Sequence, residues 1–243
     1  MKKVAIVGYS LSRSLAPFGD ESFEIWGLND LYKHIPRYDR WFQFHTANAV
    51  ERVHRAEPET RDSWETHVGV LKAMSCPVYL QGEHPEMPHS VKYPLDEILD
   101  YFSGCFVDPD DAKYFNNSIS YMIALAIYEG FDEIHVYGVD MSTLMEDGEY
   151  AHQRPSCEFW LGMAAGKGIK LYIPKEADLL KTRFLYGYED EKQHVFEKKI
   201  QALQEDVSQK KLQAIEQQRQ WRDHEKEYAG AEVALREIML TWK

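Results

Sequence analysis

Short apolar runs with the composition of β-strands alternate with helical segments, and this alternation constrains the fold more than any other feature. The runs are rich in β-branched and aromatic residues and end near turn-forming residues, as buried strands do. They occupy residues 3–8, 23–28, 40–45, 77–80, 133–139 and 170–173. Helical periodicity occupies residues 59–74, 95–102, 118–129 and 155–167. The alternation predicts an α/β fold with a doubly wound, mostly parallel sheet covered by helices on both faces.

The character of the sequence changes near residue 188. Beyond it there is no proline, and the single glycine is Gly230. The apolar residues Phe196, Ile200, Leu203 and Val207 follow the spacing of a coiled-coil seam. We therefore predict a first domain at 1–187 and a helical tail at 188–243, formed by one long helix or by two helices broken near Gly230. Packing on its own head and homo-oligomerisation through residues 191–243 explain the tail equally well.

The net charge of −12 lies in the first part of the chain, because residues 191–243 hold as many basic as acidic side chains. Proteins that coat DNA or RNA need a basic face, so we do not expect direct nucleic-acid binding. The three cysteines, Cys76, Cys105 and Cys157, are too widely spaced for a zinc pattern, and their odd number gives no disulfide framework. No apolar run is long enough for a secretory signal or a membrane span. We expect a soluble, cytoplasmic protein with no membrane partner.

Small and polar residues follow four of the predicted strands. In an open parallel sheet, ligands bind beyond the carboxyl ends of the strands. Any one of these groups is explained at least as well by an ordinary turn, because turns favour Gly, Asn, Asp and Ser. The four groups together favour a ligand site; they are Gly8-Tyr9-Ser10, Asn29-Asp30, His45-Thr46-Ala47-Asn48 and Gly138-Val139-Asp140.

The turn after the first strand, GYSLSRS, lacks the second and third glycines of the GxGxxG motif. Those glycines let a dinucleotide pyrophosphate approach the backbone, so we do not expect NAD or FAD in the usual Rossmann mode. The phosphate loop GxxxxGK[ST] is absent from the sequence, which excludes a P-loop kinase or ATPase.

Asn116, Asn117 and Ser118 precede the most apolar helix of the chain. These residue types cap helix N-termini, and the positive end of a helix also binds phosphate. The sequence does not separate the two roles.

His152 lies in a polar segment just before the predicted helix at 155–167. A histidine can take a proton from an attacking hydroxyl near neutral pH, and Arg154 can hold a phosphate or a carboxylate. The neighbouring acids also allow a hard-cation site or a plain acidic loop, although their spacing matches no calcium loop. They are Asp140, Glu146, Asp147 and Glu149.

Five segments carry a family resemblance that spans about residues 3–180. AIVGYSLS, GLND and FHTAN contain the ends of the first three predicted strands. NSISYMIALAIYEGFDEIHVYGVD and EYAHQRPSCEFWLGMAAGKGIKLYIP contain the later helices and strands. Together they resemble the bacterial lipooligosaccharide sialyltransferases. More broadly, they resemble a Rossmann-like group that includes the motility accessory proteins and the archaeal hydroxymethylpterin pyrophosphokinase.

The resemblance implies a nucleotide-sugar substrate, such as a CMP-sugar, and no need for a metal or cofactor. His152 matches the family's catalytic base, which deprotonates the acceptor hydroxyl. Tyr150 is the tyrosine nearest to the expected leaving phosphate. The resemblance places eight further residues at the donor nucleotide: Gly8, Ser10, Asn29, Asn48, Asn117, Ser118, Gly138 and Asp140.

Our leading hypothesis is a glycosyltransferase-like transferase with a nucleotide-sugar donor and His152 as general base. One alternative is a non-catalytic nucleotide binder, which is favoured by Ser142 standing where the family has a tyrosine. The others are an assembly protein with an oligomerising tail and a magnesium-dependent pyrophosphotransferase. A phage-encoded member of the group fits a small head with a helical tail, and would act in the host cytoplasm.

Overall fold

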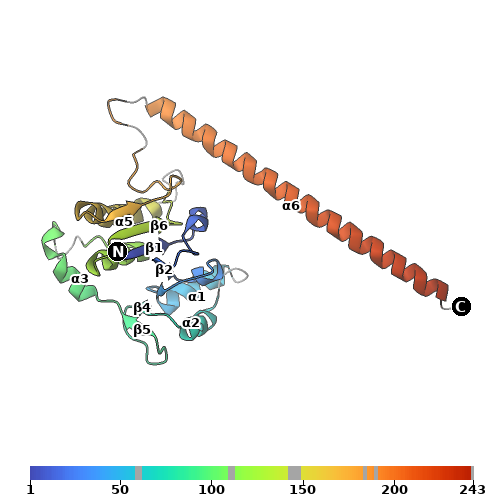
Figure 1. The fold of residues 1–243 in the computed structure, drawn as a ribbon, viewed down its shortest axis with the longest axis horizontal. Coiled ribbons are helices and arrows are strands. Elements are labelled where there is room, and N and C mark those ends of the chain that lie inside the picture. Colours follow the sequence, from blue (N-terminus) through green and yellow to red (C-terminus); the bar gives the residue numbers. More distant parts are fainter. Residues whose placement is uncertain (58–61, 109–112, 142–148, 183–184, 189–190, 242–243) are drawn as a thin grey trace. The chain divides into compact units, whose positions relative to one another are not determined.

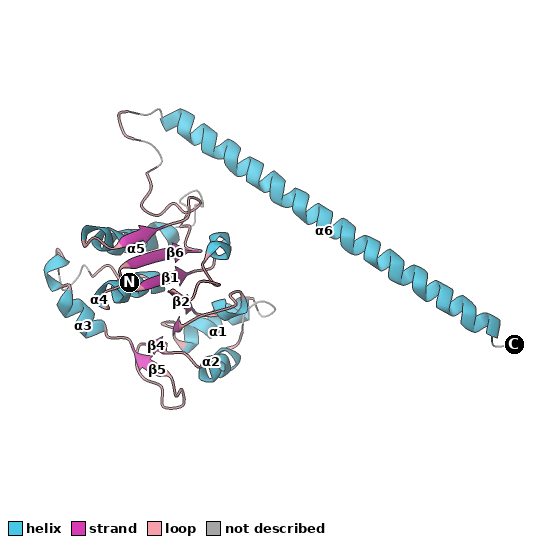
Figure 2. Ribbon diagram, in the orientation of Figure 1, coloured by secondary structure: helices cyan, strands magenta, loops and turns pink. Residues whose placement is uncertain are grey.

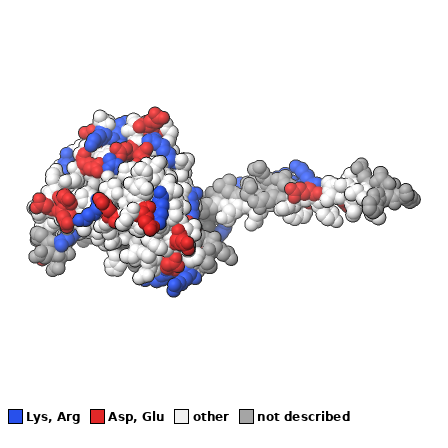
Figure 3. All heavy atoms as spheres, turned by 90° about the horizontal axis from the view of Figure 1, so that it is seen from below, with Lys and Arg blue, Asp and Glu red and all other residues white. Residues whose placement is uncertain are grey.

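The computed structural model describes residues 1–57, 62–108, 113–141, 149–182, 185–188 and 191–241. The chain divides into two compact units, Met1–Lys181 and Thr182–Lys243. The boundary predicted from the sequence, between residues 187 and 188, lies a few residues later. On the face of the first unit drawn in Figure 3, acidic and basic side chains are interspersed.

The first unit is built on a seven-stranded sheet in the order β5-β4-β3-β2-β1-β6-β7 (Figures 1 and 2). All neighbouring strands are parallel, which confirms the predicted α/β, doubly wound architecture. The strands are β1 (Lys3–Val7), β2 (Phe23–Leu28), β3 (Arg40–Phe42), β4 (Val78–Leu80), β5 (Ser90–Lys92), β6 (Glu133–Tyr137) and β7 (Lys170–Tyr172). The sequence missed β5, because its three residues, Ser-Val-Lys, carry no apolar run.

Three helices of the first unit agree with the prediction and two differ from it. The helices α2 and α3 lie within the predicted segments, and α4 begins where it was expected. The prediction missed α1, which has no buried residue and therefore a weak apolar signal. It also placed the start of α5 too late. The bounds are α1 (Ala47–Ala56), α2 (Trp64–Ala73), α3 (Leu95–Tyr101), α4 (Ser118–Tyr128) and α5 (Glu149–Gly166), with 3-10 turns at Leu11–Leu15, Leu31–Lys33 and Ser103–Cys105.

Buried aromatic residues hold the sheet and its helices together. Trp26, Trp41 and Trp160 are fully buried. The helix α4 is buried along most of its length, which explains why its sequence is apolar on every side. At the amino-terminal end of β3, the Arg40 guanidinium lies 4.8 Å from the Trp26 ring. It also forms ion pairs with Glu24 at 2.8 Å and Glu129 at 2.7 Å.

The strand order reverses between β1 and β6. β1 pairs with β2 on one side and with β6 on the other, with Ile6 opposite both Trp26 and Val136. The chain therefore leaves β1 and β6 in opposite directions, which opens a crevice beyond their carboxyl ends.

The second unit contains α6 (Glu191–Thr241), a single helix that continues through Gly230. The coiled-coil pairing expected of this segment stays a prediction. Within the parts of the chain that the structure describes, no helix is both long enough and apolar enough to cross a membrane.

Candidate functional site

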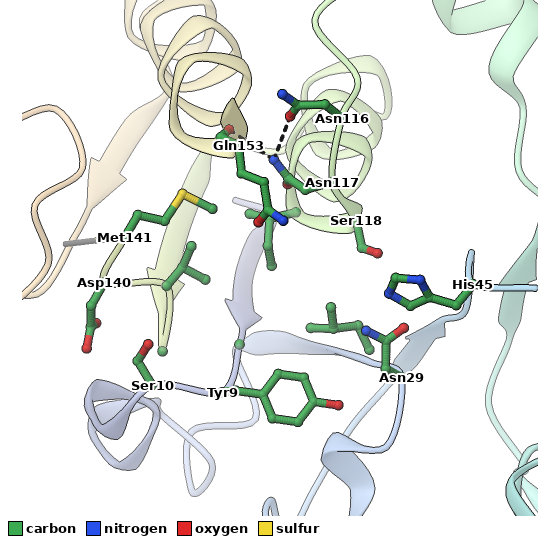
Figure 4. Close-up of a pocket in the computed structure, with 15 residues that line it drawn as sticks. Tyr9, Ser10, Asn29, His45, Asn116, Asn117, Ser118, Asp140, Met141 and Gln153 are labelled. Atoms are coloured by element: carbon green, nitrogen blue, oxygen red, sulfur yellow. Dashed lines mark hydrogen bonds between the residues drawn. The ribbon is translucent and has the colours of Figure 1, made fainter. Parts of the chain in front are cut away.

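A cavity of about 270 Å³ opens at the point where the strand order reverses. It lies between the carboxyl ends of β1, β2 and β6 and the start of α4, as Figure 4 shows. Its lining consists of Gly8, Tyr9, Ser10, Leu28, Asn29, His45, Asn116, Asn117, Ser118, Ile119, Gly138, Val139, Asp140, Met141 and Gln153. We call it the switch-point crevice.

Two glycines form the floor of the switch-point crevice. A Cβ atom on Gly8 would lie 2.5 Å from the Gly138 carbonyl oxygen, and one on Gly138 would lie 2.3 Å from that of Gly8. Gly138 also has a φ of +65°, which other residues rarely adopt. The glycines thus allow the ends of β1 and β6 to approach each other, and their role here is in packing.

Asn29 holds an uncommon backbone conformation beside this floor, with a φ of 50°. Its N–H donates to the Phe42 carbonyl, and its own carbonyl accepts from Trp41 Nε1 at 2.9 Å. Among the described residues its buried side-chain oxygen Oδ1 has no hydrogen-bond partner. Left-handed asparagines and unsatisfied buried polar atoms are both costly, and they are typical of functional sites.

Asn117 caps α4 and ties it to α5. Its Oδ1 accepts from the Ser120 N–H at 2.9 Å. Its Nδ2 donates to the Gln153 carbonyl and to Ser156 Oγ, both at 3.0 Å. Because these contacts occupy the side chain, Asn117 positions the start of α4. The helix N-terminus at Ser118 is left facing the crevice, where its amides suit an anion.

Asp140 lines the crevice, and Asp30 lies beside it, next to Tyr9 of the lining; each carboxylate accepts a hydrogen bond from a hydroxyl. Ser12 Oγ donates to Asp140 Oδ1 at 2.5 Å and accepts from the Gly138 N–H at 2.8 Å. The Tyr9 hydroxyl donates to Asp30, and the Asp30 N–H donates back to it at 3.0 Å. A carboxylate that accepts from hydroxyls can also hold the hydroxyls of a ribose or a sugar.

A second chamber of about 500 Å³ adjoins the first and shares Tyr9, Asn29 and His45 with it. Its other lining residues follow β2 or β3, or lie in α1, in α2 and just before α2: Asp30, Gln43, Ala49, Val50, Arg52, Val53, Asp62 and His67. The imidazole of His45 therefore borders both chambers. Figure 4 shows it between Ser118 and Asn29.

A hydrogen-bonded chain of side chains lies under the second chamber. His67 Nε2 lies 2.9 Å from Gln43 Oε1, and His67 Nδ1 lies 2.9 Å from the Tyr32 hydroxyl. The same hydroxyl donates to Asp62 Oδ2 at 2.9 Å. While Tyr32 donates to Asp62, its oxygen can accept from the Nδ1–H of His67, and Nε2 must also carry a proton to donate to Gln43 Oε1. All three bonds therefore form together only when His67 is protonated. Burial disfavours that charge and lowers the pKa of His67.

This lowered pKa predicts acid sensitivity. An unfolded histidine binds a proton as the pH falls through about 6.5, whereas folded His67 resists protonation to lower pH. The free energy of unfolding should therefore fall with pH below about 6.5, by at most ~1.4 kcal/mol per pH unit for each such group. In His67→Gln the unfolding free energy should fall less steeply with pH. It should still fall, because burial also lowers the pKa of His135, which the substitution leaves in place. Urea unfolding at pH 7.5 and 5.5 measures this, and equal falls in both proteins would contradict it.

The structure brings seven of the predicted site residues together. Gly8, Ser10, Asn29, Asn117, Ser118, Gly138 and Asp140 all line the switch-point crevice. Asn48 does not; it is an exposed residue in the first turn of α1. Whether any of them contacts a nucleotide stays a prediction.

Tyr150, His152 and Arg154 lie in α5. His152 and Arg154 do not line the crevice. His152 is exposed, and its carbonyl accepts from the Asn116 side chain. Arg154 Nε donates to Glu158 Oε1 at 2.7 Å, and its Nη2 donates to the Lys181 carbonyl at 3.0 Å. Ser142, Glu146 and Asp147 lie outside the described residues, as do the side chains of Glu149 and Tyr150.

Several residues that line the crevice were not predicted to be functional from the sequence. His45 stood in one of the polar strand-end groups but was not chosen among the ten histidines. Gln153 and Met141 gave no local signal. The structure has no cluster of three or more His, Cys, Asp or Glu side chains suited to a metal ion within its described ranges.

Comparison with known proteins finds similar folds among solved structures. The sialyltransferase CstII from Campylobacter jejuni, in complex with cytidine-5'-monophosphate, is 16% identical over 71% of this chain and 79% of that chain, with a TM-score of 0.43. CST-II in complex with a trisaccharide acceptor and CMP is 16% identical over 71% of this chain and 80% of that chain, with a TM-score of 0.43. An alpha-2,3-sialyltransferase from Campylobacter jejuni in its apo form is 15% identical over 71% of this chain and 75% of that chain, with a TM-score of 0.40. No family model and no curated protein matches the sequence.

Proposed function

We propose that the switch-point crevice binds a nucleotide-activated donor, such as a nucleotide-sugar, and that the protein transfers the activated group to an acceptor hydroxyl. The proposal depends mainly on one observation. The start of α4 at Ser118, which suits an anion, and the carboxylate of Asp140, which accepts from a hydroxyl, line the same cavity at the switch point. Helix amides suit the donor phosphate, and the carboxylate suits ribose or sugar hydroxyls. The sequence resemblance to nucleotide-sugar transferases points the same way.

Two histidines are candidates for the general base. The resemblance assigns this role to His152, which is exposed on α5. The geometry favours His45, because its imidazole borders both chambers and so lies where a donor and an acceptor would meet. An acceptor in the second chamber would lose its proton to His45 as its oxygen attacks the donor carbon and the nucleotide phosphate leaves.

Thermal-shift measurements with CMP, UDP, GDP and their sugars test the binding. A ligand at 100 times its dissociation constant should stabilise the protein by about 2.7 kcal/mol. Ser118→Asp should abolish the shift, because it places a carboxylate where the phosphate would bind. Aspartate is well tolerated at a helix start, so this variant should remain folded. Ser118→Asn is the uncharged control and should retain the shift.

The rate of donor turnover then shows which of the two histidines is the general base. The variant of the true base, His45→Gln or His152→Gln, should lower turnover by ~10²–10⁴-fold while leaving the thermal shift intact. No shift with any nucleotide would contradict the proposed site. Unchanged turnover in both variants would contradict the histidine base.

A non-catalytic nucleotide binder is the second candidate function. It is favoured by the position of His152 and Arg154 outside the crevice lining. It predicts the same thermal shift and the same loss in Ser118→Asp, but no product with any acceptor.

A further inference from the structure

The helix α6 carries an apolar residue at every seventh position over most of its length. These residues are Ile200, Val207, Ala214, Trp221, Tyr228 and Leu235. All six are exposed, and the exposed fraction is 63% for Val207 and 65% for Trp221. Residues three positions further along complete a heptad repeat: Lys210, Gln217, His224, Ala231 and Ile238. One heptad register therefore runs from Ile200 to Ile238, with polar residues at three of its positions, Lys210, Gln217 and His224.

A repeat of this period identifies the kind of partner. An α-helix has 3.6 residues per turn, so a strict 3.5-residue spacing stays on one face only when helices supercoil around each other. A helix that packs on a globular head uses a wider stripe with a 3.6-residue period. The partner of α6 is therefore another long helix with the same repeat. We propose that it is α6 of a second copy of this chain, and that the two helices run antiparallel.

The polar residues of the seam decide the orientation. A parallel pair in register would place Lys210 against the partner's Lys210, two like charges in one core layer. An antiparallel pair centred on residue 219 places Lys210 against the partner's Tyr228, where an ammonium can lie over an aromatic ring. The same register brings Ile200 against the partner's Ile238.

The residues beside the seam support the same register. In the antiparallel pair Lys211 flanks the partner's Glu225, and by symmetry this attractive pair occurs twice. In the parallel pair Asp206 would flank the partner's Lys211, but Glu227 would flank the partner's Glu232, so a like-charge pair offsets the attractive one. Charge complementarity in the core and beside it therefore favours the antiparallel dimer.

Sedimentation of the full chain at micromolar concentration tests the dimer. We expect a dimer, and we expect Val207→Glu, on the seam, to raise its dissociation constant by roughly 100-fold. Val233→Glu is a matched control: Val233 lies on the opposite side of the helix and is similarly exposed, at 60%. It should leave the dimer intact. A monomeric wild-type chain, or equal effects of the two substitutions, would overturn the proposal.

Cysteine pairing tests the orientation, in a Cys105→Ser background that removes the exposed native thiol. Under mild oxidation the double variant Ile200→Cys, Ile238→Cys should form a covalent dimer, because the two positions face each other across the antiparallel pair. Neither single variant should do so. Covalent dimers from the single variants would show a parallel pair and overturn the proposed orientation.

Discussion

Replacing Gly138 by alanine is expected to lower the free energy of unfolding of the first unit by about 3 kcal/mol. The left-handed backbone at φ +65° accounts for about 1–2 kcal/mol of this. The remainder arises because the new Cβ would lie 2.3 Å from the Gly8 carbonyl oxygen, which is backbone and cannot rotate away. Urea unfolding followed by tryptophan fluorescence measures the effect.

Gly168 provides the matched control. Its φ is +79°, but a Cβ there would meet no atom within 4 Å. Gly168→Ala should therefore show only the conformational part, about 1 kcal/mol. If the two alanine variants lost the same stability, the close approach of β1 and β6 would not be what requires a glycine at the crevice floor.

Asn117→Ala should also destabilise the first unit by about 3 kcal/mol. Loss of a helix cap costs about 1 kcal/mol. The change also leaves the buried Ser156 hydroxyl without one of its partners and removes the amide that donates to the Gln153 carbonyl, which adds ~1–3 kcal/mol. Because Asn117 aligns α4 with α5, ligand-induced stabilisation should fall as well. Urea unfolding and thermal shift with nucleotide measure the two effects.

Asn48→Ala is the control for Asn117. Both asparagines were assigned to the nucleotide by resemblance, but Asn48 is exposed in the first turn of α1. Its substitution should change the unfolding free energy by less than about 0.5 kcal/mol. A loss as large as that of Asn117→Ala would contradict the positioning role given to Asn117.

Most of the sheet was predictable because its strands carry a local signal. The runs at β1, β2 and β6 are five or six residues long and mostly apolar, as is typical of parallel strands buried on both faces. The short strand β5 and the helix α1 gave no such signal, because β5 has a single apolar residue among three and no residue of α1 is buried.

The crevice was predictable in part for a general reason. Residues that follow parallel strands meet at one edge, and this brought Gly8, Asn29 and Gly138 together as expected. The start of α5 was misplaced because proline favours the first turn of a helix, whereas Pro155 lies well inside α5. The chain from Gln43 through His67 to Tyr32 was not predictable, because its members come from separate segments that only the fold brings together.

Arg40 stabilises the sheet at the end of the strands that lies away from the ligand-binding crevice. Its ion pairs with Glu24 and Glu129 fasten the amino-terminal edge of the sheet, the edge away from the crevice. The residues that would choose a ligand lie beyond the opposite ends of the strands. Substitutions that alter ligand specificity can therefore accumulate in those loops while the ion pairs of Arg40 keep the sheet folded. The same fold can thus change its ligand without changing its core.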